Sequence, residues 1–205
     1  MIGHISPTDD VENRERVVVN QLVKNNLNIV SGLAKGCDAI AHRGCLESGG
    51  KTIAILPTTL QKISPAVNRK LAEDIVKDGG LLLTEYYREP KGRQETIKRY
   101  IERDRLQALF SKAIILIASY KKDEGDSGSR HAMESARQFD IPRYVMYNAE
   151  MDTEDKQFGL NKQLLADETN IKILSKTSIE EIKIVDNVLL DRESEVCSGI
   201  QIKLF

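Results

Sequence analysis

The sequence has no tryptophan and only three cysteines and five prolines in 205 residues. The cysteines Cys37, Cys45 and Cys197 form no CxxC pair, which argues against a disulfide framework and a zinc ribbon. We therefore expect reduced thiols and no metal site. No apolar run approaches the roughly 20 residues that span a bilayer, and residues 1–5 lack the layout of a signal peptide. These absences predict a cytoplasmic protein with no membrane contact.

The chain also has no excess of charge of either sign, because its 30 basic residues nearly balance its 31 acidic residues. A role in nucleic-acid binding would therefore require basic side chains concentrated on one face. The hydrophobic content of 40% suffices for one sizeable core but not for two full enzyme domains. We predict one domain over residues 1–183 and a C-terminal tail over residues 184–205.

Short apolar runs alternate with stretches of helical periodicity, which predicts an α/β, Rossmann-like, doubly wound and mainly parallel sheet with helices on both faces. The expected strands are Leu27–Val30, Thr52–Leu56, Leu81–Thr84, Ala113–Ala118, Arg143–Tyr147, Ile171–Leu174 and one more over Met1–Ile5. The expected helices are Val11–Lys24, Cys37–Glu47, Pro65–Lys77, Thr96–Phe110, Ser129–Phe139, Leu160–Asp167 and Ser178–Lys183.

A glycine-containing loop follows the first long strand and enters a helix, a geometry that attracts anions. Gly32 and Gly36 let the backbone approach a phosphate, while Ser31 and Lys35 offer a hydroxyl and a positive charge. The alternative is a strand-to-helix turn that merely needs glycine. Asp38 and His42 lie four residues apart, so they can meet on one helical face, more often as a structural hydrogen bond than as a catalytic pair. No catalytic residue is predicted.

Two further stretches carry candidate contacts. Residues 91–105 hold six basic and three acidic side chains close to tyrosines, which suits single-stranded nucleic acid but also fits a solvated helix with internal ion pairs. The loop Ser127-Gly128-Ser129 enters a helix and offers a second anion site, with Glu134 one turn beyond Arg130.

Several of these motifs, in order and at similar spacing over residues 27–183, resemble the DNA-processing protein A (DprA/Smf) family of the SLOG superfamily. The run from Ser31 to His42 resembles the glycine loop of that family. The others are residues 53–60, the Pro-x-x-Asn helix start at 65–68, the Gly-x-x-x-Thr-Glu strand end at 80–85, the Arg-Asn-Arg helix at 103–105, the second loop at 127–129 and a closing helix at 159–165.

The resemblance implies a non-enzymatic protein that binds single-stranded DNA, helps to load the RecA recombinase in recombination or DNA uptake, and forms a homodimer. The implied DNA- or phosphate-binding residues are Ser31, Gly32, Leu33, Lys35, Gly36, Asn68, Arg69, Arg103, Arg105, Ser127, Gly128 and Ser129. The sequence departs from the family pattern at Gly3-His4-Ile5-Ser6, where Gly-Ser-Arg is expected, and at Ser119, where a glutamate is expected. No winged-helix pattern follows Lys183.

Two alternatives remain open. Other SLOG proteins bind nucleotides or cleave their N-glycosidic bonds, so no cofactor is required but a nucleotide or phosphate could occupy the glycine-loop cleft. The last residues, with Gln201, Leu204 and Phe205, resemble the peptide that docks bacterial replication and repair proteins on the sliding clamp. An apolar final strand added to the sheet is the other interpretation of that peptide.

Overall fold

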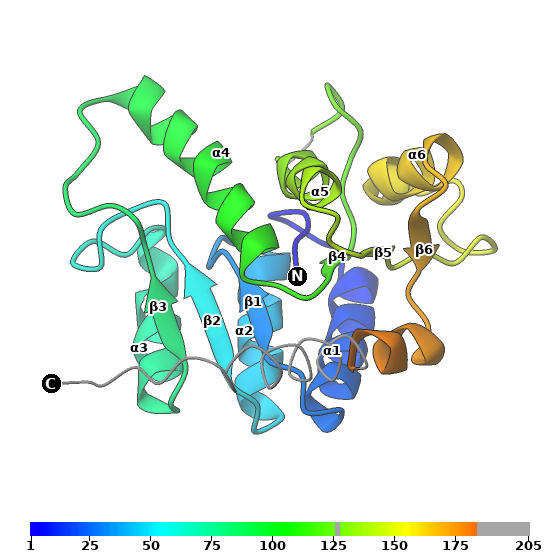
Figure 1. Cartoon of the computed structure of the whole chain (residues 1–205), viewed down its shortest axis with the longest axis horizontal. Helices are drawn as coiled ribbons and strands as arrows, with labels where there is room; N and C mark the ends of the chain where they lie inside the picture. The colour runs from blue at the N-terminus through cyan, green and yellow to red at the C-terminus, as the bar shows by residue number, and fades with distance from the viewer. Residues whose placement is uncertain (126–127, 184–205) are drawn as a thin grey trace, which may run out of the picture.

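The computed structural model describes residues 1–125 and 128–183, in which strands and helices alternate along the chain (Figure 1). The strands are β1 (Ile29–Ser31), β2 (Thr52–Ile55), β3 (Leu81–Leu83), β4 (Ile114–Leu116), β5 (Arg143–Val145) and β6 (Ile171–Ile173). The α-helices are α1 (Asp9–Lys24), α2 (Cys37–Glu47), α3 (Arg69–Lys77), α4 (Arg93–Leu109), α5 (Ser129–Gln138) and α6 (Gly159–Asp167). Short 3-10 helices cover Ala66–Asn68 and Lys156–Phe158, and residues 176–183 are helical.

The strands form two parallel three-stranded sheets, β1-β2-β3 and β4-β5-β6, which the N-terminal segment joins. The Met1 nitrogen donates to Val30 O of β1, and Ile2 forms a parallel bridge with Leu116 of β4. The strand expected over Met1–Ile5 is thus a single bridge, extended by a hydrogen bond from His4 N to Ala118 O at 2.8 Å. The segment turns away there because His4 O accepts from Cys37 N of α2.

Helices cover both faces of the sheet. Helices α1, α2 and α3 pack side by side on one face, and α4 and α5 pack together on the other (Figure 1). Side chains of α1, β1, β4 and the helix at residues 176–183 form the largest core cluster, which includes Val11, Val19, Ile115 and Ile182. This arrangement confirms the predicted Rossmann-like fold class.

The direction of chain winding changes at the N-terminal segment. From this segment the chain proceeds through β1, β2 and β3 in one direction, and after α4 it continues through β4, β5 and β6 in the other. Open α/β sheets bind ligands in the crevice outside the carboxyl ends of their strands at such a switch point. The fold therefore points to the edge where residues 3–8, the loop after β1 and the loop after β4 meet.

Candidate functional site

A cavity of about 370 Å³ opens at this switch point between α4, α5 and the N-terminal segment. One wall is apolar and contains side chains of the N-terminal segment and of the outer part of α4. The other wall is polar and carries side chains of α2, α4 and the first turn of α5. The residues that decide its character are Ile5, Ile97, Tyr100, Asp38, Arg103, Asp104, Ser129, Arg130 and His131.

The glycine loop after β1 borders this cavity, but its backbone amides already bind a side-chain carboxylate of the chain. Asp38 Oδ2 accepts hydrogen bonds from Gly32 N and Ala34 N, each at 3.2 Å. The Ser31 hydroxyl is buried and donates to Met1 O at 2.8 Å. These groups, predicted to receive a phosphate, are therefore occupied within the chain.

Two positions in the loop have a left-handed backbone. Gly36 has φ +68°, and a β-carbon there would lie 2.3 Å from His4 O, so only glycine fits. Leu33 is fully buried at φ +60°, a conformation that is unusual for a branched side chain. Packing of Leu33 in the α2–α3 core cluster holds this turn in place.

Asn68 anchors the loop from the neighbouring chain segment. Its buried side-chain amide donates to Leu33 O at 2.9 Å and to Ala34 O at 3.0 Å. Arg69 follows Asn68 in the chain, and Lys35 follows Ala34. Both side chains are exposed, and neither forms an ion pair within residues 1–125 and 128–183. Asn68 is thus a structural anchor of the glycine loop, and an exposed cation follows each end of this contact in the chain.

Arg103 lies beneath the loop and is only 5% exposed. Its guanidinium donates to Ile55 O at 3.2 Å, pairs with Asp104 at 3.1 Å and lies 3.9 Å from Asp38. With its amide oxygen oriented toward the guanidinium, Gln107 accepts two further hydrogen bonds from it, at 2.9 and 3.1 Å. A β-carbon at Gly32 would lie 1.4 Å from Arg103 Nη1, so glycine is needed here to admit the buried cation. The predicted phosphate contact is thus a side chain enclosed by the protein.

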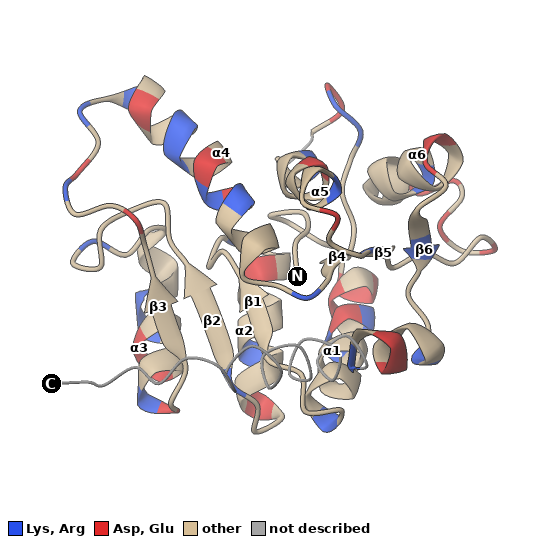
Figure 2. Cartoon of the chain, viewed as in Figure 1, with Lys and Arg blue, Asp and Glu red and all other residues tan. Residues whose placement is uncertain are grey.

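Arg105, the other predicted contact on α4, lies on the surface. It donates both hydrogen bonds of a bidentate pair to Glu85, at 2.8 and 3.0 Å. Similar pairs continue along the helix, where Arg99 binds Glu95 at 2.7 Å and lies over the Tyr86 ring. Figure 2 shows that basic and acidic residues alternate along α4. Helix α4 is therefore rich in basic residues, as predicted, and several of these residues are paired with carboxylates of the same chain.

The second predicted loop enters α5 beside the cavity. Gly128 is left-handed at φ +86° and precedes Ser129, whose hydroxyl donates to Gly3 O at 3.3 Å. Ser127 lies outside the described residues. The structure thus joins the start of α5 to the N-terminal segment across the switch point.

Six polar or aromatic residues of the cavity were not among the predicted contacts: Asp38, Tyr100, Asp104, Gln107, Arg130 and His131. Three of them recur every three or four residues on α4, a spacing that places them on one helical face. This spacing is a sequence signal for the three residues on α4, but it is difficult to recognise among the many charged residues of the same helix. His131 comes from α5, and only the fold brings it to the cavity.

The sequence offers His42, Asp38 and Glu134 as possible acid–base groups, and none of them is placed for catalysis. His42 is fully buried against Thr52 Oγ1 at 2.7 Å, and burial lowers its pKa to about 3. Asp38 is turned toward the loop amides, so the two side chains do not form the pair that their spacing allows. Glu134 binds Arg137, and this hydrogen bond holds its pKa at about 2, too low for a general acid near neutral pH.

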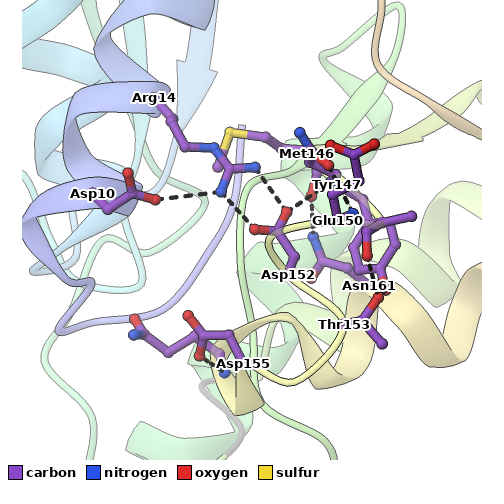
Figure 3. A network of polar contacts seen from close by, with 12 residues as sticks. Asp10, Arg14, Met146, Tyr147, Glu150, Asp152, Thr153, Asp155 and Asn161 are labelled. Carbon is purple, nitrogen blue, oxygen red and sulfur yellow. Dashed lines mark hydrogen bonds and ion pairs between the residues drawn. The ribbon is translucent and has the colours of Figure 1, made fainter.

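A polar network fixes the carboxyl ends of β4 and β5 (Figure 3). The side-chain amide of Asn161 donates to Ile117 O and Met146 O, each at 2.9 Å, and its oxygen accepts from Ser119 N at 3.2 Å. Arg14 of α1 forms a bidentate pair with Asp152 at 2.7 and 2.8 Å, which attaches the loop after β5 to the opposite layer. These bonds hold the strand ends, the loop after β5 and helices α1 and α6 together.

Comparison with known proteins decides the family. A sequence model described as DNA recombination-mediator protein A matches residues 1–183. The chain belongs to this family. It is 37% identical over 143 residues to protein Smf of Synechocystis and 35% identical over 133 residues to DNA processing protein DprA of Streptococcus pneumoniae. These matches cover 69% and 64% of this chain but only 35% and 45% of the relatives, so the chain spans less than half of their length.

Solved DprA structures agree with this assignment. DprA from Streptococcus pneumoniae superposes with a TM-score of 0.70 at 25% identity, over 87% of this chain and 58% of that one. DprA from Helicobacter pylori, studied for its single-stranded DNA binding mode, also superposes with a TM-score of 0.70 at 25% identity. This match covers 93% of the present chain and 79% of the Helicobacter pylori chain. A molybdenum cofactor carrier protein from Chlamydomonas reinhardtii shares only the fold, with a TM-score of 0.54 at 15% identity over 92% and 94%. Among the described residues no helix is long and apolar enough to cross a membrane.

Proposed function

We propose that this DprA-family chain binds single-stranded DNA along the carboxyl edge of its sheet and acts without catalysis in DNA processing and recombination. The observation that carries the proposal is the cavity at the switch point, which the glycine loop borders at Ala34 next to the exposed Lys35, in a chain whose Helicobacter pylori relative binds single-stranded DNA. Exposed cations attract phosphates, and Tyr100 together with the apolar wall offers a surface for bases.

The main phosphate contacts are a subset of those implied by the family motifs. Lys35 and Arg69 are exposed and unpaired within the described residues, so they can bind phosphates without breaking an existing ion pair. Arg105 can do so only in exchange for Glu85, and Arg103 is enclosed. We therefore assign the main contacts to Lys35 and Arg69, and a structural role to Arg103.

The test is fluorescence anisotropy of a labelled single-stranded oligonucleotide titrated with the full chain at several salt concentrations, with duplex DNA as competitor. Arg69→Glu should weaken binding roughly tenfold, equivalent to about 1.4 kcal/mol, and lower the salt slope by about one. Lys77→Glu is the matched control, because Lys77 is exposed at the opposite end of the same helix. Equal effects of both reversals, or no binding by the wild-type chain at low salt, would contradict the proposal.

Further parts of the proposal concern partners and location. We infer a cytoplasmic homodimer that presents DNA to the RecA recombinase, and membership of a recombination-mediator family supports the role in recombination. Sedimentation of the purified chain tests the dimer, and RecA filament assembly on oligonucleotide with and without the chain tests the second partner. The sliding-clamp peptide, with Gln201, Leu204 and Phe205, lies outside the described residues. Its test is deletion of residues 201–205, which should abolish clamp binding and leave thermal stability unchanged.

A nucleotide is the second candidate ligand. The cavity volume of about 370 Å³ falls within the range of small-molecule sites, and Tyr100 stands opposite the polar side chains of α5. A ligand bound at one hundred times its Kd stabilises the folded state by about 2.7 kcal/mol. A panel of nucleotides that leaves the melting temperature unchanged would exclude this candidate.

A further inference from the structure

Asp104 is the carboxylate of α4 that faces the cavity. Its side chain is 15% exposed, and Arg103 Nε donates to its Oδ1 at 3.1 Å. Its other oxygen points to the start of α5, where a β-carbon on Gly128 would lie 4.0 Å from Oδ2. The carboxylate therefore occupies the space between the buried arginine and the first turn of α5, beside the proposed path of the DNA.

The charges around Asp104 come from three helices. Arg103 lies on the same helix, Asp38 on α2, and Arg130 and His131 on α5, while Tyr100 adds a phenol. The described part of the N-terminal segment contributes only Ile2, Gly3 and Ile5 to the cavity. Asp38 and Asp104 thus share the single positive charge of Arg103, and this enclosed group of three carries one net negative charge when both carboxyls are ionised.

We propose that Asp104 sets the affinity of this cleft for DNA, because its carboxylate repels the phosphate backbone when ionised and admits it when protonated. The inference rests on the proposed function. Removing one negative charge leaves the group of three neutral, so it no longer repels a phosphate in the cavity. Asp104 is thus a residue that tunes binding through charge.

Two observations support this assignment. Burial raises the pKa of Asp104 to about 6, against the opposing effect of Arg103 and with a further raising effect of Asp38. The carboxyl therefore changes its charge close to neutral pH. The position of the side chain agrees with this role, because Asp104 lines the cavity between Arg103 and the start of α5.

The sign of the pH dependence follows from linkage. Phosphate favours the protonated carboxyl, so bound DNA raises the pKa of Asp104 further, and a proton is taken up on binding. Affinity should be highest below pH 6 and fall as the pH rises above the pKa of the free protein. The fall is at most about tenfold per pH unit, because a single proton is involved.

The test compares three proteins by oligonucleotide anisotropy from pH 5.5 to 8.5 at constant ionic strength: wild type, Asp104→Asn and Glu102→Gln. Glu102 is the matched control, because it lies on the same helix and changes net charge equally but binds Tyr86 and Lys98 outside the cavity. Asp104→Asn should bind about tenfold more tightly than wild type at pH 8 and show the flatter profile. Glu102→Gln should follow the wild-type profile.

Parallel pH profiles for wild type and Asp104→Asn would overturn the inference and leave the proposed function standing. Absence of binding by all three proteins would instead overturn the proposed function, and this inference with it. Circular dichroism of each variant establishes that the fold is retained, which the near-identical shapes of aspartate and asparagine favour.

Discussion

Replacement of Arg103 by methionine should destabilise the fold far more than the same replacement of Arg105. Arg103 is 5% exposed and compensates two enclosed carboxylates, whereas Arg105 forms one pair at the surface. Breaking a buried ion pair by removing one partner costs about 3–5 kcal/mol, whereas an exposed pair contributes about 0–1 kcal/mol. We therefore expect a loss of about 3–5 kcal/mol for Arg103→Met and less than about 1 kcal/mol for Arg105→Met.

The loss should also depend on pH. Without the guanidinium, the pKa of Asp104 rises above its present value of about 6, since Arg103 is the group that lowers it. A carboxyl with a raised pKa in the folded state stabilises that state below its unfolded pKa and loses this contribution as the pH rises. The destabilisation by Arg103→Met should therefore be larger at pH 8 than at pH 5.

Urea unfolding followed by circular dichroism, at pH 5 and pH 8, measures both effects. The midpoint should shift for Arg103→Met without a large change in slope, because the surface exposed on unfolding is similar. A loss below about 1 kcal/mol would refute the reasoning, since that is the value expected for an exposed phosphate-binding arginine. The structural role of Arg103 would then have to be abandoned in favour of a DNA contact.

Two further perturbations test the supports of the site. Glu15 is fully buried with neither carboxyl oxygen hydrogen-bonded within the described residues, and burial raises its pKa well above the usual value. Wild-type stability should consequently fall as the pH rises above the unfolded pKa of about 4.3, and Glu15→Gln should remove this fall in melting curves from pH 4 to 8. Asn161→Ala should cost about 3 kcal/mol in urea unfolding, because it leaves Ile117 O, Met146 O and Ser119 N without their buried partner. A cost near zero would show that water replaces the amide.

The pattern of apolar runs predicted the order and type of the elements, because each strand and helix buries one continuous apolar face. The limits Cys37–Glu47 agree with α2 in full. The helix expected from Thr96 instead begins at Arg93, since Glu95 accepts from Lys91 N at 2.7 Å and the Thr96 hydroxyl donates to Gly92 O at 3.0 Å. The spacing of apolar residues indicates only the packed face of a helix. The start of an exposed first turn depends on local hydrogen bonds such as these.

The candidate site was harder to predict because a sequence does not record which charges are buried. Gly32 and Arg103 lie 71 residues apart, yet the glycine exists to make room for the guanidinium. Spacing relates Asp38 to His42 on one helical face, whereas the bonds that Asp38 accepts from Gly32 N and Ala34 N depend on the turn at Leu33. These contacts arise from tertiary packing, and local spacing contains no signal for them.

The occupied loop has a consequence for how DNA would be held. In a phosphate loop the backbone amides supply fixed, short-range hydrogen bonds, but here Asp38 accepts two of them. Binding then depends on the exposed Lys35 and Arg69, which act over a longer range and are screened by salt. Since Asn68 fixes the backbone beside both cations, their spacing is set by the fold while their side chains stay adaptable. Such a surface suits a partner that is recognised by its regular backbone charge, whatever its base sequence.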